Sequence, residues 1–209
     1  MTPFTQDSIQ LKNCIIHLLY FKPFEAVEFL AHLTPEETER FFTFSHANRR
    51  QEFVATRFLR HQLFGYNHIH YTEHGAPYIE DEGFISISHA PGVVGLAISQ
   101  HFQLGLDIEP IRTKAHSLQS KFLSTDEMLE FDTSSELEMT KVWSAKEALY
   151  KLAGRKQLIF KTDLLLSKKS SDVWNGRIIN PDEIRTVDLT IFEKENCVYT
   201  VNDCPIQLQ

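Results

Sequence analysis

The sequence is poor in cysteine, contains no long hydrophobic run and has fewer basic than acidic side chains. Its three cysteines, Cys14, Cys197 and Cys204, lack the spacing of metal ligands, which argues against a zinc site and a disulfide framework. No stretch is long enough to span a membrane, and Met1–Gln10 lacks the apolar core of a signal peptide. The net charge of −7 argues against a general nucleic-acid-binding protein. We therefore expect a cytoplasmic protein that binds neither nucleic acid nor membrane.

The composition is otherwise that of an ordinary globular protein. The chain of 209 residues is long enough for one large domain or two small ones. Hydrophobic residues make up 42% and charged residues 23%, as in typical folded domains. Sixteen phenylalanines predict a core that is rich in aromatic side chains.

Two capping boxes mark helix starts in different parts of the chain. Thr34 and Glu37 predict the start of a helix, and Ser124 and Glu127 repeat the pattern downstream. A further helix, between these two, carries a regular apolar stripe and is predicted to stop at Gly65. Helices followed by short strands therefore occur twice along the chain.

This repeated order predicts two halves, each with helices on a small, mainly antiparallel sheet, in the α/β (α+β) class. The natural boundary follows Glu109, since no linker or low-complexity segment interrupts the chain. We expect an N-terminal half at residues 1–109 and a C-terminal half at residues 110–209.

Short strands are predicted in both halves. Three of them, at residues 84–89, 93–98 and 102–109, follow one another and predict an antiparallel meander. In a meander Ser88 and His89 would lie near the end of the third strand. The other predicted strands are 14–20, 69–73, 158–160, 163–167, 172–174, 177–179, 186–193 and 196–201, the last two as a hairpin.

Residues 104–109 alternate apolar and acidic side chains after a glycine. In a strand Asp107 and Glu109 would point to the same side, about 7 Å apart. Two carboxylates so placed repel each other unless a cation lies between them, and oxygen ligands of this kind suit Mg²⁺. The same alternation is also typical of a strand edge that only faces solvent.

The predicted helix that ends at Gly65 is unusually basic for an acidic protein. Its arginines either form a solvated helix face or bind an anion, because guanidinium groups match phosphate oxygens in pairs. These arginines are Arg49, Arg50, Arg57 and Arg60.

A third helix, predicted from about Ser135 to Ala153, presents one polar and one apolar face. Trp143, Glu147 and Lys151 fall within about 80° of one another, and Lys146 points away from them. Glu147 and Lys151 alone would make an ordinary surface ion pair. The opposite side carries the apolar residues Ala145, Ala148, Leu149 and Leu152.

Two stretches together, G-x-D-I-E at residues 105–109 and W-S-x-K-E-A-x-x-K at residues 143–151, resemble the motifs of 4'-phosphopantetheinyl transferases. The likeness is to the single-chain, Sfp-like (surfactin-synthetase-activating) type, in its W/KEA subgroup. Ile87-Ser88-His89 resembles the I-S-H-S strand end of that family, and Gly75-Ala76-Pro77 lies where the family commonly has G-K-P. The arginine-rich helix also resembles the N-terminal half of these enzymes.

The resemblance implies two pseudo-symmetric halves with coenzyme A bound in the cleft between them. The implied reaction moves the 4'-phosphopantetheine arm of coenzyme A onto a serine of an acyl or peptidyl carrier protein and releases 3',5'-ADP. The implied cofactor is Mg²⁺, with Mn²⁺ as a substitute. A monomer is expected, because an internally duplicated chain forms its site without a partner.

The resemblance also implies roles at the metal site. Asp107, Glu109 and Glu147 would hold Mg²⁺ against the pyrophosphate of coenzyme A. Glu147 would in addition act as the base for the carrier serine. Lys151 would contact the phosphates and stabilise charge on the leaving group. Trp143 is expected to pack the helix against the strand.

For coenzyme A, the resemblance implies that Ser88 and His89 bind the 3'-phosphate side and that Arg57 binds another phosphate. The sequence departs from the family at Ala76, where a lysine is usual, so His74 or Arg49 would have to supply that cation. We expect weaker coenzyme A binding from this change rather than lost activity.

Two other functions are compatible with parts of the sequence. One is a non-catalytic relative that binds carrier protein or coenzyme A, although the retained acids argue against it. The other is a Mg²⁺-dependent nucleotide hydrolase, but the chain has no G-x-x-x-x-G-K-[ST] loop. The identity of the carrier protein is left open, and Arg112, Lys114 and Lys121 are candidates for a basic patch that would face it.

Overall fold

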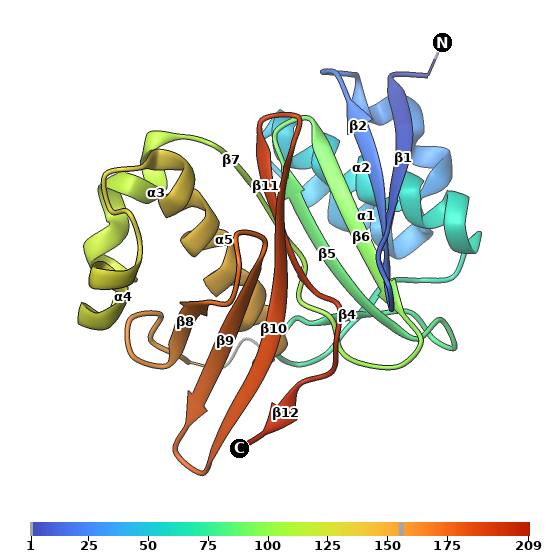
Figure 1. The fold of residues 1–209 in the computed structure, drawn as a ribbon. Helices are drawn as coiled ribbons and strands as arrows, with labels where there is room; N and C mark the ends of the chain where they lie inside the picture. Colours follow the sequence, from blue (N-terminus) through green and yellow to red (C-terminus); the bar gives the residue numbers. More distant parts are fainter. Residues whose placement is uncertain (1, 155–156) are drawn as a thin grey trace.

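The computed structural model describes residues 2–154 and 157–209, which form an α+β fold of helices packed on antiparallel sheets (Figure 1). This confirms the predicted fold class. The first part of the chain contains β1 (Phe4–Gln10), β2 (Ile15–Phe21), a 3₁₀ helix (Ala26–His32), α1 (Pro35–Thr43), α2 (Ala47–Phe64), β3 (His70–Tyr71), β4 (Pro77–Tyr78), β5 (Phe84–Ala90) and β6 (Val93–Ser99).

The second part of the chain continues the same mixture of helices and strands. It contains β7 (Asp107–Pro110), α3 (Thr113–Leu118), a second 3₁₀ helix (Gln119–Lys121), α4 (Thr125–Glu130), α5 (Glu136–Leu152), β8 (Leu164–Lys168), β9 (Val173–Asn180), β10 (Glu183–Lys194), β11 (Cys197–Asn202) and β12 (Gln207–Leu208).

The strands form two main sheets. A four-stranded sheet has the order β1-β2-β6-β5, and a six-stranded sheet has the order β7-β11-β10-β9-β8 with β12 beside β10. Strands β3 and β4 make a separate short ribbon. Every strand pair in the described part of the chain is antiparallel.

The predicted meander is wrong in its third strand. Strands β5 and β6 pair as expected, but β7 pairs with β11, so that Asp107 lies opposite Thr200. The reason is that β6 already has β2 on one side and β5 on the other and therefore has no free edge. The chain changes sheet before Asp107, and the division at Glu109 stays a prediction.

The helix starts agree closely with the sequence. Both predicted capping boxes are present, at Thr34 for α1 and at Ser124 for α4, and Gly65 ends α2 with a positive φ of 61°. Helix α5 spans Glu136–Leu152 and buries its predicted apolar stripe. Its members Ala145, Ala148, Leu149 and Leu152 all lie in one core cluster.

Several strand predictions are wrong in detail. Residues 158–160 are not a strand, and the two strands predicted at 172–174 and 177–179 are one continuous strand, β9. Gly176 lies inside β9 because a larger side chain there would collide with Leu149 of α5. The sequence analysis also missed β1, which is mostly polar and exposed, and β12. The predicted hairpin is confirmed as β10 and β11.

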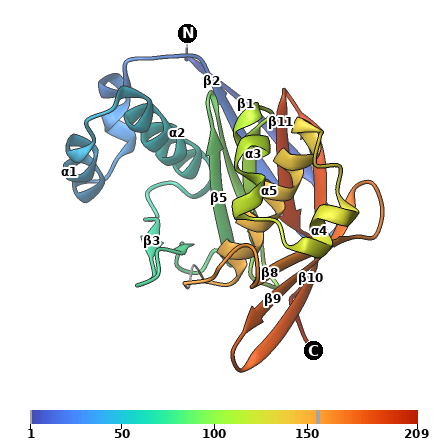
Figure 2. The ribbon, with the colours of Figure 1, turned by 90° about the vertical axis from the view of Figure 1, so that its left-hand side faces the viewer.

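The two long helices cover opposite sides of the paired sheets. Helix α2 packs on the four-stranded sheet and α5 packs on the six-stranded sheet, and β5 lies between these helices in both views (Figures 1 and 2). A third cluster, with Ile16, Leu106 and Tyr199 among its members, fills the space between the sheets. No helix within residues 2–154 and 157–209 is long and apolar enough to cross a lipid bilayer.

Candidate active site at the junction of the two sheets

Strands β5 and β7 belong to different sheets, and two serine hydroxyls join them. The backbone N–H of Leu106 donates to Ser86 Oγ at 2.9 Å, and the N–H of Ile108 donates to Ser88 Oγ at 3.0 Å. The two serines are two residues apart and therefore lie on one face of β5. They give the amides of the second sheet the partners that a neighbouring strand would otherwise supply.

Asp107 lies at this junction and is held from one side. Its Oδ1 accepts from Lys151 Nζ at 3.0 Å and from Ser88 Oγ at 3.2 Å. Its Oδ2 is buried and has no hydrogen-bond partner within the part of the chain that the structure describes. A carboxylate oxygen buried in this way is expected to meet a proton or a cation.

Glu109 is held by the indole of Trp143. Trp143 Nε1 donates to Glu109 Oε1 at 3.0 Å, and the guanidinium of Arg112 lies 3.8 Å from Oε2. The pKa of Glu109 is raised, first because the carboxyl is buried and then because Asp107 is a nearby negative charge. The raised pKa therefore reflects the burial of Glu109 and its repulsion by a second carboxylate, against the opposing charge of Arg112.

Glu147 and Lys151 come from one face of α5, as the helical spacing predicts. Together with Asp107, Glu109 and His89 they line a cavity of about 260 Å³. The buried free oxygen of Asp107 and the oxygen-only acids fit a hard divalent cation. Among the described residues, no three His, Cys, Asp or Glu side chains are already grouped closely enough to hold a metal ion. Asp107 and Glu109 have different partners, since Lys151 donates to Asp107 and Trp143 donates to Glu109.

Close backbone packing sets the distance between β7 and α5. A Cβ atom on Gly105 would collide with the carbonyl oxygen of Ala148, so only glycine fits before this strand. The N–H of Gly105 donates to Oδ1 of Asn202 at 2.9 Å, and the amide of Asn202 donates in turn to the carbonyl of Gln103 at 2.9 Å. The segment that leads into Asp107 is therefore fixed on two sides.

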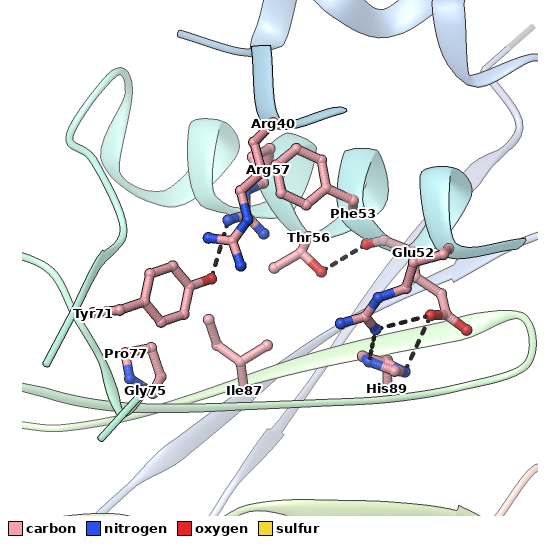
Figure 3. Close-up of a pocket in the computed structure, with 11 residues that line it drawn as sticks. Arg40, Glu52, Phe53, Thr56, Arg57, Tyr71, Gly75, Pro77, Ile87 and His89 are labelled. Atoms are coloured by element: carbon pink, nitrogen blue, oxygen red, sulfur yellow. Dashed lines mark hydrogen bonds and ion pairs between the residues drawn. The ribbon is translucent and has the colours of Figure 1, made fainter. Parts of the chain in front are cut away.

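A second, basic cavity of about 330 Å³ lies beside the first, between α2 and the end of β5 (Figure 3). Three arginines face it, and His89 lines both cavities. Its lining residues are Arg40, Arg49, Glu52, Phe53, Thr56, Arg57, Tyr71, Gly75, Pro77, Ile87 and His89.

Arg57 is the most firmly held of these arginines. Arg57 is only 5% exposed, and its Nε donates to Glu37 Oε1 at 3.3 Å. Its Nη2 donates to the hydroxyl of Tyr71 at 3.0 Å (Figure 3). The guanidinium also lies 3.8 Å from the ring centre of Phe53. Arg60 is fully buried and bonds Glu37 Oε2 at 2.8 Å. A solvated helix face is therefore the wrong interpretation for Arg57 and Arg60.

His89 connects the two cavities through a small charged cluster. Arg49 Nη1 lies 2.7 Å from His89 Nε2, and Glu52 Oε2 lies 3.5 Å from His89 Nδ1. Because a guanidinium only donates, Nε2 accepts and Nδ1 carries the ring proton toward Glu52. Desolvation lowers the pKa of His89, and the negative charge of Glu52 opposes this shift.

Some residues at these cavities were missed by the sequence analysis. Arg40 and Tyr71 line the basic cavity, and the bond from Trp143 to Glu109 adds orientation to its expected packing role. Lys146, in contrast, does not reach either cavity, because its ammonium is buried against Glu127 and two carbonyls. The sequence predicted Glu37 only as the third residue of a capping box. Its contacts with the arginines of α2 depend on tertiary packing and were not predicted.

Comparison with known protein families gave a match to part of the chain. A family model described as the 4'-phosphopantetheinyl transferase superfamily matches residues 103–194. No curated protein matches the chain. The match covers less than half of the chain, but it includes β7 and the whole of α5. Residues 103–194, which carry Asp107, Glu109, Glu147 and Lys151, thus match the 4'-phosphopantetheinyl transferase superfamily.

Proposed function

We propose that this protein transfers the 4'-phosphopantetheine arm of coenzyme A to a serine of an acyl or peptidyl carrier protein. The observation that carries the proposal is the pairing of a basic cavity with an acidic one, with His89 in the lining of both. A substrate with a phosphorylated nucleoside at one end and a reactive pyrophosphate nearby fits such a pair. The enzyme would be a holo-[acyl-carrier-protein] synthase of the Sfp-like type, in the W/KEA subgroup.

The basic cavity is proposed to bind the nucleotide part of coenzyme A. Arg57 and His89 would hold phosphate oxygens, and the positive charge of Lys151 would lie near the pyrophosphate. Arg49 is the better candidate for the cation missing at Ala76, because it lines the cavity and contacts His89. His74 is not among the lining residues and pairs with its neighbour Glu73.

The acidic cavity is proposed to carry the chemistry. Asp107, Glu109 and Glu147 would hold Mg²⁺, or Mn²⁺ in its place, and the ion would neutralise charge on the pyrophosphate. Glu147 would take the proton of the carrier serine, whose oxygen forms a bond to the β-phosphorus. The bond from that phosphorus to the bridging oxygen breaks, and 3',5'-ADP leaves with Lys151 stabilising its charge.

The remaining parts of the proposal concern the surroundings of the enzyme. We propose a cytoplasmic monomer whose partners are coenzyme A and a carrier protein of fatty acid, polyketide or nonribosomal peptide biosynthesis. Arg112 and Lys114, beside Glu109, line a small groove that an acidic carrier protein would approach.

The test is the intact mass of an apo carrier protein after incubation with this protein, coenzyme A and Mg²⁺, beside a sample with EDTA. We expect a metal-dependent gain of one phosphopantetheine arm. Asp107→Ala and Glu147→Ala should abolish the gain while circular dichroism shows a folded protein. Normal transfer by either variant would contradict the metal assignment, and no transfer to any of several carrier proteins would contradict the function.

A further inference from the structure

Ser88 has a different place in the site from the one that its sequence motif suggests. Ser88 is 5% exposed, and its hydroxyl lies between β7 and α5, where it bonds Ile108 and Lys151. We propose that Ser88 is a positioning residue for Asp107, which fixes the carboxylate so that Oδ2 alone is left for a divalent cation. This inference rests on the proposed metal site and assigns Ser88 no direct contact with coenzyme A.

The hydrogen-bond inventory of the hydroxyl carries the first step. Ser88 Oγ receives the N–H of Ile108 at 3.0 Å and an N–H of Lys151 at 3.1 Å. Both groups can only donate, so they occupy the two lone pairs of the oxygen. The single hydroxyl hydrogen is therefore directed to its third partner, Asp107 Oδ1, at 3.2 Å. No donor or acceptor capacity of Ser88 is left for a ligand.

Lys151 locks the same arrangement from the helix. Its ammonium has three N–H groups and three acceptors, namely Asp107 Oδ1 at 3.0 Å, Ser88 Oγ at 3.1 Å and the carbonyl of Leu106 at 2.6 Å. A carboxylate with two donors on one oxygen does not rotate freely. The buried Oδ2 of Asp107, which has no partner among the described residues, is consequently held in one direction.

The neighbouring serine provides a matched control. Ser86 lies on the same face of β5, is buried to a similar degree, and accepts the N–H of Leu106 at 2.9 Å. It thus makes the same bond between the sheets as Ser88. In the hydrogen bonds of the described residues, Ser86 has no contact with Asp107 or Lys151. Removing either hydroxyl therefore costs one bond at the junction, and only Ser88 also releases the carboxylate.

The experiment measures Mn²⁺ binding to the ligand-free protein by electron paramagnetic resonance, and coenzyme A binding in EDTA by calorimetry. We expect Ser88→Ala to bind Mn²⁺ about 10–100-fold more weakly than the wild type, as for other residues that orient metal ligands. Ser86→Ala should keep wild-type Mn²⁺ affinity despite a similar fall in the denaturation midpoint. Both variants should bind coenzyme A as the wild type does.

Equal Mn²⁺ affinity in both serine variants would overturn the inference, as would a Ser88→Ala protein that keeps Mn²⁺ and loses coenzyme A. Should Ser88→Ala fail to fold, Ser88→Cys places a slightly larger group with a weak donor and a weak acceptor at the same position, and wild-type Mn²⁺ affinity in that variant would also overturn the inference. A wild-type protein that binds no Mn²⁺ would contradict the metal site itself. The carrier-protein assay tests the transfer separately from these outcomes.

Discussion

Two capped helices, α1 and α4, each carry a buried glutamate at their third position, and the two glutamates can be compared directly. Glu37 of α1 and Glu127 of α4 each accept the backbone N–H of the capping residue, at 3.1 Å and 2.8 Å. Each also bonds a cation on the long helix that follows. Glu37 holds Arg57 and Arg60, whereas Glu127 holds Lys146.

The difference lies in what the cation faces. Lys146 is 0% exposed, and its remaining N–H groups donate to the carbonyls of Phe122 and Phe160. Arg57 bonds Glu37 with one part of its guanidinium and leaves another part at the wall of the basic cavity. The same capping-box glutamate therefore neutralises a cation inside the core at α4, and orients an arginine at the wall of a candidate ligand site at α1.

The largest effect is expected from Lys146→Met, which removes the cation and leaves Glu127 buried without it. Breaking a buried ion pair from one side costs about 3–5 kcal/mol of unfolding free energy. Urea denaturation followed by circular dichroism measures the loss. The double variant Lys146→Met/Glu127→Gln should recover part of it, and a loss below about 1 kcal/mol in the single variant would contradict the interpretation of this pair.

The next test sets Glu37→Gln against Glu127→Gln. Each removes a buried charge from beside a cation, and we expect each to lose about 2–3 kcal/mol of unfolding free energy. Only Glu37→Gln should weaken coenzyme A binding, about tenfold, because Arg57 loses the partner that orients it. Calorimetry in the presence of EDTA measures the coenzyme A affinity of each variant. An equal change in both variants would show that Glu37 has no role in coenzyme A binding beyond the stability that both glutamates provide.

A smaller effect separates the two arginines that share Glu37. Arg57→Lys and Arg60→Lys both keep the charge and lose the planar fork, so both should cost about 1 kcal/mol of stability. Arg57→Lys alone should raise the KM for coenzyme A several-fold, since only Arg57 lines the cavity. Steady-state kinetics decides between them, with a raised KM in Arg60→Lys as the contrary result.

The smallest effect concerns pH. Burial lowers the pKa of His89, and the charges that face the ring are Glu52, Arg49, Lys151 and Asp107. A bound phosphate favours the protonated ring and raises this pKa, so binding takes up a proton. Coenzyme A affinity should therefore rise, about threefold, as the pH falls through the pKa of His89 in the complex. It should level off below the pKa of His89 in the free protein.

Comparison with His89→Asn isolates this effect, because the phosphate of coenzyme A titrates equally in both proteins. The wild type should gain affinity relative to the variant as the pH falls through and below the ordinary histidine pKa of about 6.5, because the pKa of His89 in the free protein is lower than that value. Parallel pH profiles for the two proteins would show that His89 does not meet a phosphate.

Local signals explain what the sequence analysis predicted well. A capping box joins residues three apart, and Thr34 and Ser124 therefore marked α1 and α4 correctly. Strand alternation placed Asp107 and Glu109 on one side, and helical spacing did the same for Glu147 and Lys151. All four line one cavity.

Long-range packing explains what was not predicted. The pairing of β7 with β11 joins residues about ninety positions apart and leaves no trace in local periodicity. The burial of Lys146 is of the same kind, since its acceptors come from three separate segments. From sequence alone, a charged side chain on a helix is expected to face solvent. Only the tertiary structure shows that Lys146 is buried and paired with Glu127.

The serine bridges between β5 and β7 have a practical consequence for observing the molecule in solution. The amides of Leu106 and Ile108 are bonded to side chains of the other sheet, rather than to a neighbouring strand of their own. Their exchange with deuterated water therefore depends on separation of the two sheets, while most strand amides report on unfolding within one sheet. The exchange rates of these two amides would therefore measure any separation of the two sheets.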